Sequence, residues 1–572
     1  MRSLTPTPMP RWLIATAASL VIGALAPASI AARQADAPLA PALTGLGTLH
    51  MPVTTGNARA QAFFDQGVRL LYGFNHEESR RAFREAARLD PDLAIAHWGV
   101  ALTLSPNLNA PMPPVQGREA YSAVQTALAL ASRAGPRERA LIDALARRLA
   151  ADPASPRAPL DRAYADQMAR VVAAYPNDPD VITFYADAVM NTMPWDYWQK
   201  DGSPRPETAI ISAALERAIA THPDHPGAHH YYIHLLEASN TPERAEASAD
   251  RLGSLMPAAG HMVHMPAHIY IRVGRYADAA EANVKAIAAD EDYLAQCQAQ
   301  GLYPVSYYPH NLHFLWAAAT LEGRSAVAID AARQVAAKVP HHHAGALGWT
   351  ADFPVTPWLA YVRFGRWQEM LTEPSPPASE PFAAGIWHYG RGLAFVARRQ
   401  ADRAEAEIQA LDALLDHEAF RTTLKDLPLR TNLQIASLLV KGELAASAGQ
   451  HDTAIRLVSE AMTIEDAMPY GEPPIWHHPP RQVLGALLLE AGRAAEAEAI
   501  YREDLARFRE NGWSLFGLWQ ALVAQHRTED ARIVRARFDK AWSRADVTLT
   551  ASRILGGHAA PLSQFGTGHA GH

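Results

Sequence analysis

Residues 58 to 92 read ARAQAFFDQGVRLLYGFNHEESRRAFREAARLDPD. Apolar residues recur every three or four positions on both sides of a short turn at Gly73 to Asn75, and Pro91 closes the second run. This spacing is typical of two amphipathic helices joined by a tight turn. The stretch therefore predicts a helical hairpin that must bury its apolar faces against a neighbouring unit.

Similar hairpins recur along the chain. Ser79, Phe83, Ala86 and Pro91 stand where the second helix of a tetratricopeptide repeat carries a small, an aromatic, a small and a proline residue, so the stretch resembles that family. The resemblance extends from about residue 57 to 545. Further hairpins are predicted at 269–292, 312–340 and 484–508, and weaker ones at 396–415 and 441–462.

The repeats predict an all-α fold, a tetratricopeptide-type α-solenoid in which helical hairpins stack into a right-handed superhelix with a concave groove. No stretch alternates with period two for long enough to predict a sheet. Because 572 residues exceed the size of a single core, we expect either several domains or a repeat array. The predicted parts are a signal peptide (1–32), a linker (33–56), an N-terminal solenoid with a histidine-rich groove (57–371), a proline-rich connection (372–381), a C-terminal solenoid (382–546) and a glycine- and histidine-rich tail (547–572).

The first residues indicate export. Two arginines precede an apolar run from Trp12 to about Ala26, and small residues follow up to Ala31. This order is typical of a cleaved signal peptide, and the run is shorter than the ~20 residues of a membrane span. We therefore expect a periplasmic or secreted protein with no membrane span after cleavage. Cys297 is the only cysteine, so no internal disulfide stabilises the fold.

Resemblance and charge narrow the class of function. The stretches FNHEES, HWGVALTLSPN, HMVHMPAHIYIRVGRYADA and NGWSLFGLWQAL are similar to those of exported bacterial tetratricopeptide proteins. That resemblance implies export and a solenoid, and it implies no reaction. A formal net charge of -7 gives no reason to expect nucleic acid as a partner.

Histidines occupy equivalent positions in three consecutive first helices. His264 lies as far before the turn residue Gly274 in the sequence as His313 lies before Gly323. In the preceding unit, Asn240 holds the turn position because asparagine tolerates the left-handed conformation. We call each set of equivalent positions a column. The histidines in these columns are His230, His234, His261, His264, His268, His310 and His313.

These spacings favour a metal site. Helical offsets of three and seven positions put His261, His264 and His268 on one face, unless Pro266 starts the helix and leaves His261 in the entering loop. Packed helices lie roughly 8 to 10 Å apart, a gap that facing imidazoles can close onto one ion. Two such bridges are expected, one of His230 and His234 with His264 and His268, and the other of His261 and His264 with His310 and His313. Imidazole ligands suit a transition metal, here copper, zinc or iron. Glu237 is expected to orient a histidine, bind the ion or act as a base.

Two functions remain open at this point. The first is a metal-binding protein or metal-dependent oxidoreductase. The second is a metal-free periplasmic scaffold that binds a peptide or partner protein in the concave groove. An insertion containing Tyr303, Tyr307 and Tyr308 is either a lid or a packed aromatic loop. Two further clusters, PHHHAG at 340–345 and EPPIWHHPP at 472–480, are interpreted as polar loops.

Overall fold

The computed structural model describes residues 38–297, 303–339 and 350–555, and from Ala40 onward these belong to one compact unit. The predicted signal peptide, the PHHHAG segment and the last part of the tail lie outside the described residues. Within the described ranges the regular structure is helical, and two isolated bridges, Asn107 with Ala110 and Trp198 with Pro204, are the nearest approach to a strand. The predicted all-α, tetratricopeptide-type solenoid is confirmed.

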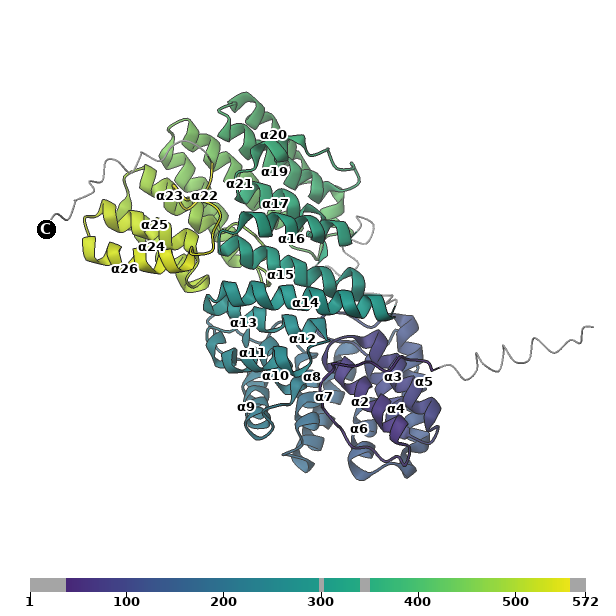
Figure 1. Ribbon diagram of the computed structural model, residues 1–572. Coiled ribbons are helices and arrows are strands. Elements are labelled where there is room, and N and C mark those ends of the chain that lie inside the picture. Colours follow the sequence, from purple (N-terminus) through teal and green to yellow (C-terminus); the bar gives the residue numbers. More distant parts are fainter. Residues whose placement is uncertain (1–37, 298–302, 340–349, 556–572) are drawn as a thin grey trace, which may run out of the picture. The chain divides into compact units, whose positions relative to one another are not determined.

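The helices follow one another as antiparallel pairs (Figure 1). Those of the N-terminal part are α2 (Ala58–Tyr72), α3 (His76–Leu89), α4 (Ala94–Thr103), α5 (Pro114–Leu130), α6 (Pro136–Ala146), α7 (Arg157–Ala174), α8 (Pro179–Met190), α9 (Pro206–Thr221), α10 (Pro226–Leu236) and α11 (Glu246–Leu255). Those of the middle are α12 (Gly260–His264), α13 (Pro266–Val273), α14 (Tyr276–Cys297), α15 (Tyr307–Leu321), α16 (Ser325–Lys338), α17 (Thr356–Arg363) and α18 (Trp367–Thr372). The C-terminal part contains α19 (Pro381–Ala397), α20 (Ala401–Leu414), α21 (Leu429–Ser447), α22 (His451–Ala467), α23 (Pro480–Glu490), α24 (Ala494–Arg507), α25 (Gly512–Ala524) and α26 (Thr528–Ala541).

A glycine–aromatic–glycine pattern sets the distance between neighbouring helices. The Phe83 ring of α3 lies against Gly67 of α2 and Gly99 of α4, so that a Cβ at either glycine would lie within 2.6 Å of ring atoms. The two glycines are equally far from Phe83 in the sequence. Tyr501 lies in the same way between Gly485 and Gly517, with the same even spacing on its two sides. The same repeat geometry therefore operates at both ends of the described chain.

Left-handed glycines end several first helices. Gly274 (φ +84°) ends α13 and Gly323 (φ +72°) follows α15, as their turn positions predict. Asn240 does not adopt a positive φ, so the left-handed turn expected there is wrong. A short 3₁₀ turn, Pro242–Ala245, leads into α11 instead, because Pro242 restricts the residue before it.

Segments outside the hairpins pack on them. In the predicted linker, His50 Nδ1 contacts Asp65 of α2 at 2.7 Å and Leu46 is buried. The proline-rich connection joins α18 to α19. In the tail region, Arg553 is buried against Glu443 and Glu490. Because these segments contact helices, they bury apolar and charged groups that would otherwise face water.

The C-terminal repeats also contact the turns of the middle repeats. Tyr276 donates to the carbonyl of Arg509 at 2.7 Å, and Trp513 donates to the carbonyl of Thr320 at 2.9 Å. These contacts bring residues 469–473, which precede α23, close to α10 and α13. Among the described residues, no helix has both the length and the apolar character needed to cross a membrane.

Replacing Phe83 by alanine tests the repeat geometry. The change empties the space between Gly67 and Gly99, so we expect a loss of about 3 to 5 kcal/mol in the free energy of unfolding. Chemical unfolding followed by far-ultraviolet circular dichroism measures it. Ile210→Ala, at a side chain that is 56% exposed, is the control and changes stability by less than about 0.5 kcal/mol. Equal effects of the two substitutions would contradict the role given to Phe83.

Candidate metal centre

Helix α10 carries two histidines, one turn apart, that are both buried. His230 Nδ1 donates to the backbone carbonyl of Tyr72 at 2.5 Å, and His234 Nδ1 donates to Glu237 Oε1 at 2.7 Å. Because both acceptors hold the proton on Nδ1, the Nε2 atoms present lone pairs. Neither Nε2 atom has a hydrogen-bond partner among the described residues. Each ring is thus fixed in the tautomer and orientation of a ligand.

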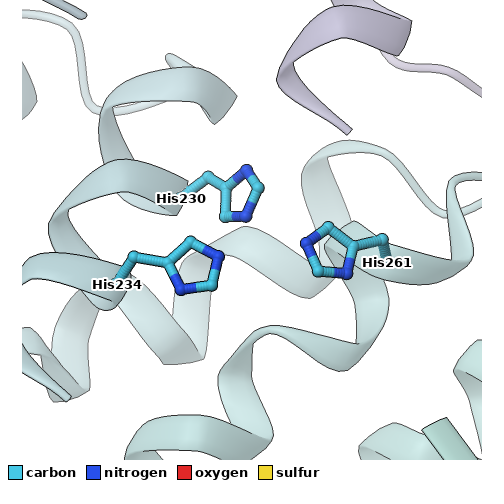
Figure 2. Close-up of side chains that lie close together, drawn as sticks. All are labelled: His230, His234 and His261. Carbon is cyan, nitrogen blue, oxygen red and sulfur yellow. The ribbon is translucent and has the colours of Figure 1, made fainter. Parts of the chain in front are cut away.

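The third ring comes from α12. His261 is 1% exposed, and neither of its ring nitrogens has a partner within the described part of the chain. Its ring centroid lies 5.0 Å from that of His230 and 6.1 Å from that of His234. Figure 2 shows the His261 ring facing the rings of His230 and His234. One nitrogen of each ring lies within 4.8 Å of the other two. We call His230, His234 and His261 the first histidine group.

A second histidine group, His264, His268 and His310, lies beside the first, and its ligand atoms also lie within 4.8 Å of one another. His264 Nδ1 contacts Asn283 Oδ1 at 2.7 Å. The amide of Asn283 is oriented because its Nδ2 donates to the Ala279 carbonyl, so His264 must donate from Nδ1. His264 Nε2 is then an acceptor, and it lies 2.9 Å from His268 Nε2.

Glu237 joins the two groups. Glu237 is fully buried at the end of α10. Its second oxygen, Oε2, accepts a hydrogen bond from His268 Nδ1 at 2.5 Å. Burial alone would raise the pKa of Glu237, but the charge of His268 and the hydrogen bonds from His234 and His268 together lower it well below its ordinary value. Burial alone would lower the pKa of His268, but the Glu237 carboxylate raises it to about 9. The two residues form a buried ion pair.

The other histidines of the two groups have lowered pKa values, in contrast to His268. Burial lowers the pKa of His230, His261 and His264 well below the usual value of an imidazole, and neighbouring histidines lower these pKa values further. The pKa values of His234 and His310 are shifted in the same direction, again mainly by burial. Neutral imidazole is the form that binds a metal ion. The protein therefore holds these five side chains ready as ligands.

Glu472 is a candidate site residue that the sequence did not reveal. The segment EPPIWHHPP was interpreted as a polar loop, but Glu472 is buried and its carboxylate lies 3.5 Å from His268 Nδ1. Glu237, His268 and Glu472 form a third cluster of possible ligands. Burial raises the pKa of Glu472 to about 7. Of the histidines that follow, His478 is buried and His477 is half-buried, so neither is exposed as in a polar loop.

Aromatic rings form the wall of the first histidine group. The Phe74 ring centroid lies 4.5 Å from that of His230 and 5.2 Å from that of His261, and Tyr307 lies 5.0 Å from His261. The backbone N–H of His261 donates to the Tyr303 hydroxyl. Tyr303 and Tyr307 therefore pack as an aromatic loop against the site, whereas Tyr308 contacts Glu291.

Not every predicted ligand joins a group. His313 packs against Trp316 and Phe353, with ring centroids 4.9 and 4.7 Å away, and among the described residues it belongs to none of the three clusters. Two bridges were expected from the columns, one joining α10 to α13 and one including His313. The structure instead places His261 with α10, since His261 lies in a separate helical turn before Pro266 rather than in a loop.

A cavity of about 530 Å³ opens beside both histidine groups. Apolar, aromatic and acidic side chains line it together with the histidines, among them Leu108, Trp195, His234, Glu237, His261, Tyr307, His268, His310, Tyr470 and Glu472. A larger cavity of about 760 Å³ lies among the C-terminal repeats and includes no member of the two groups. The smaller cavity is thus the one where chemistry at the histidines would act on a bound molecule.

Comparison with known proteins finds only distant structural likenesses. No family model matches the chain, and no curated protein is similar to it in sequence. Similar solved structures are the human IFIT1 dimer with PPP-AAAA (13% identity, 85% of this chain and 92% of that chain, TM-score 0.31), the APC/C Cut9–Hcn1 hetero-tetramer (13%, 82% and 79%, 0.31) and yeast Tom70 (12%, 85% and 92%, 0.25). All three are tetratricopeptide-type helical repeat proteins. With TM-scores this low, we assign no residue of the site from them.

Replacing Glu237 by glutamine tests the link between the groups. The amide removes the negative charge and faces His234 and His268 N–H groups with one acceptor oxygen, so a buried imidazolium loses its counter-ion. We expect stability to fall by about 3 kcal/mol, measured by urea unfolding in the presence of a chelator. Glu243→Gln, at a half-exposed surface position, is the matched control and leaves the unfolding midpoint unchanged. An unchanged midpoint for Glu237→Gln would refute this role.

Proposed function

We propose that this protein binds a transition-metal ion through buried histidines and uses it to act on a small molecule held in the adjoining cavity. One observation carries the proposal. His230 Nε2, His234 Nε2 and both ring nitrogens of His261 are buried, lack partners among the described residues and face one space. A buried polar atom without a partner costs about 1 to 3 kcal/mol. A bound ion would satisfy all three rings together.

The surroundings of the rings support the same interpretation. A ligating histidine usually donates its second nitrogen to a carboxylate or a backbone carbonyl, which fixes the ring. Glu237 supplies this contact for His234, and the Tyr72 carbonyl supplies it for His230. In a site without a metal ion, nothing requires hydrogen bonds that direct the lone pairs of several buried histidines toward one point.

Copper, zinc and iron fit this ligand set, because imidazole suits these ions while magnesium and calcium prefer oxygen ligands. The cavity volume falls within the usual range of small-molecule sites, about 300 to 1,000 Å³. A metal at the edge of such a cavity can polarise a bound molecule. We therefore favour metal-dependent chemistry on a bound molecule, of which an oxidoreductase is one form, over passive metal binding.

Metal analysis of the purified chain, prepared without a histidine tag, tests the proposal. We expect bound copper, zinc or iron in at least one equivalent per chain, measured by elemental analysis after dialysis. His230→Ala combined with His261→Ala lowers the bound metal by at least half, because two rings of the first histidine group are lost. His313→Ala retains the metal, since that ring packs outside the groups.

The contrary result has a clear meaning. Protein that contains no metal and takes up neither copper nor zinc at micromolar concentration would overturn the proposal. In that case a peptide-binding scaffold is the function that remains, and the histidines serve as hydrogen-bond donors to the partner.

We also propose that the protein is exported. The support is the order of arginines, apolar run and small residues in positions 1–32. Amino-terminal sequencing of the protein recovered from a bacterial periplasmic fraction is expected to start near residue 33. A chain that stays in the cytoplasm with the predicted signal peptide uncleaved would contradict export and would leave the metal proposal intact.

A further inference from the structure

We infer that the site binds two metal ions side by side, one in each histidine group, and that copper is the ion it fits best. The inference rests on the proposed function and goes beyond it in number, place and identity of the ions. It follows from the way the two groups are built.

The two groups repeat one design. Each has a pair of histidines one helical turn apart, His230 with His234 on α10 and His264 with His268 across α12 and α13. A third ring comes from a helix that follows the pair in the sequence, His261 for the first group and His310 for the second. Each group thus supplies three imidazole nitrogens. Three protein ligands leave a coordination position open for a bound molecule.

The groups are close enough for their ions to act together. Ring centroids of His234 and His268 lie 5.6 Å apart, and those of His261 and His264 lie 5.7 Å apart. Glu237 contacts one histidine of each group through its two oxygens. Paired ions in known sites lie about 3.5 to 4 Å apart and share a ligand or substrate between them. The short distances between the two histidine groups therefore permit such a pair of ions.

The third cluster, Glu237, His268 and Glu472, does not form a site for a third ion. It orients a ligand of the second ion. His268 turns Nδ1 toward Glu237 and Glu472, and Nε2 toward His264. Because carboxylates hold its Nδ1 proton, the ring can bind an ion only through Nε2, which gives up its own proton when the ion binds. The cluster therefore orients a ligand of the second group, and its two carboxylates bring negative charge beside the ions.

The type of ligand favours copper. The ligand set is imidazole without thiolate, and Cu²⁺ binds nitrogen ligands more tightly than other divalent ions of its row. His264 Nε2 and His268 Nε2 share a hydrogen bond at 2.9 Å, so an ion that takes the place of the shared proton would contact both rings.

The cavity reaches both groups. His234 and His261 of the first group and His268 and His310 of the second all line it. A small molecule bound there can contact both ions at once. The molecule that fits is small and has two adjacent donor atoms, such as two oxygens, that can bridge two metal ions. It would lie against the apolar part of the cavity wall, which includes Trp195 and Tyr307.

Copper titration of the metal-free full-length chain counts the ions. The background protein carries His558→Ala, His569→Ala and His572→Ala, so that the tail histidines cannot bind copper. Equilibrium dialysis against Cu²⁺ is expected to give two tightly bound ions per chain. His261→Gln and His310→Gln each bind one, and His313→Gln, the matched control, binds two. Circular dichroism and thermal unfolding confirm that each variant is folded.

Electron paramagnetic resonance tests whether the ions are neighbours, and the single copper of His310→Gln provides the reference signal. Two adjacent Cu²⁺ ions couple, so the signal per bound copper in the background protein is expected to fall below half of that from a single copper in His310→Gln. One ion at saturation, or two ions with a full uncoupled signal, would overturn this inference and leave the proposed metal binding standing. No bound copper and no other metal would overturn both.

Discussion

The buried carboxylate of Glu237 is the contact on which the rest of the centre depends. It accepts one N–H from His234 and one from His268, so a single side chain fixes rings on two helices. Taking that carboxylate out of water is costly, and only the charge on His268 and good hydrogen-bond geometry offset the cost. Loss of either partner would leave an uncompensated charge. The orientation of the histidine groups and the position of α10 against α13 are therefore determined together.

The repeat geometry brings the rings within reach of Glu237. Glycines at the helix crossings let an aromatic side chain pack directly on the neighbouring backbones, as Phe83 does on Gly67 and Gly99. Successive first helices then lie side by side, and residues at equal distances from the turns face the same interior. Pro266 modifies this regularity because it cannot donate a backbone hydrogen bond, so the first helix of this unit divides into α12 and α13. That division turns His261 toward α10 while His264 and His268 face α15.

The sequence predicted the hairpins and the histidine columns because both depend on local periodicity. It could not predict the partners that come from distant repeats. Phe74 and the carbonyl of Tyr72 precede His230 by several repeats, and Glu472 follows His268 by several more. Nothing in the residues around Glu472 indicates burial, since proline-rich loops are normally exposed. His313 was expected as a ligand because it shares a column with His264, but its ring packs on Phe353 instead. A column gives the direction in which a side chain leaves its helix, whereas the packing of neighbours decides where its ring ends.

Burial also bears on the choice between a metal centre and a peptide-binding groove. Side chains that hold an extended peptide must be reachable from solvent before the peptide arrives, and their polar atoms are hydrated until then. His230, His234 and His261 are each at most 2% exposed, and aromatic rings pack against them. Their unsatisfied nitrogens therefore destabilise the chain unless something small enough to enter between the rings binds them. A single ion meets that condition, and a peptide does not. The acidic pair Glu237 and Glu472 adds to the argument, because it would repel a carboxylate terminus and attract a cation.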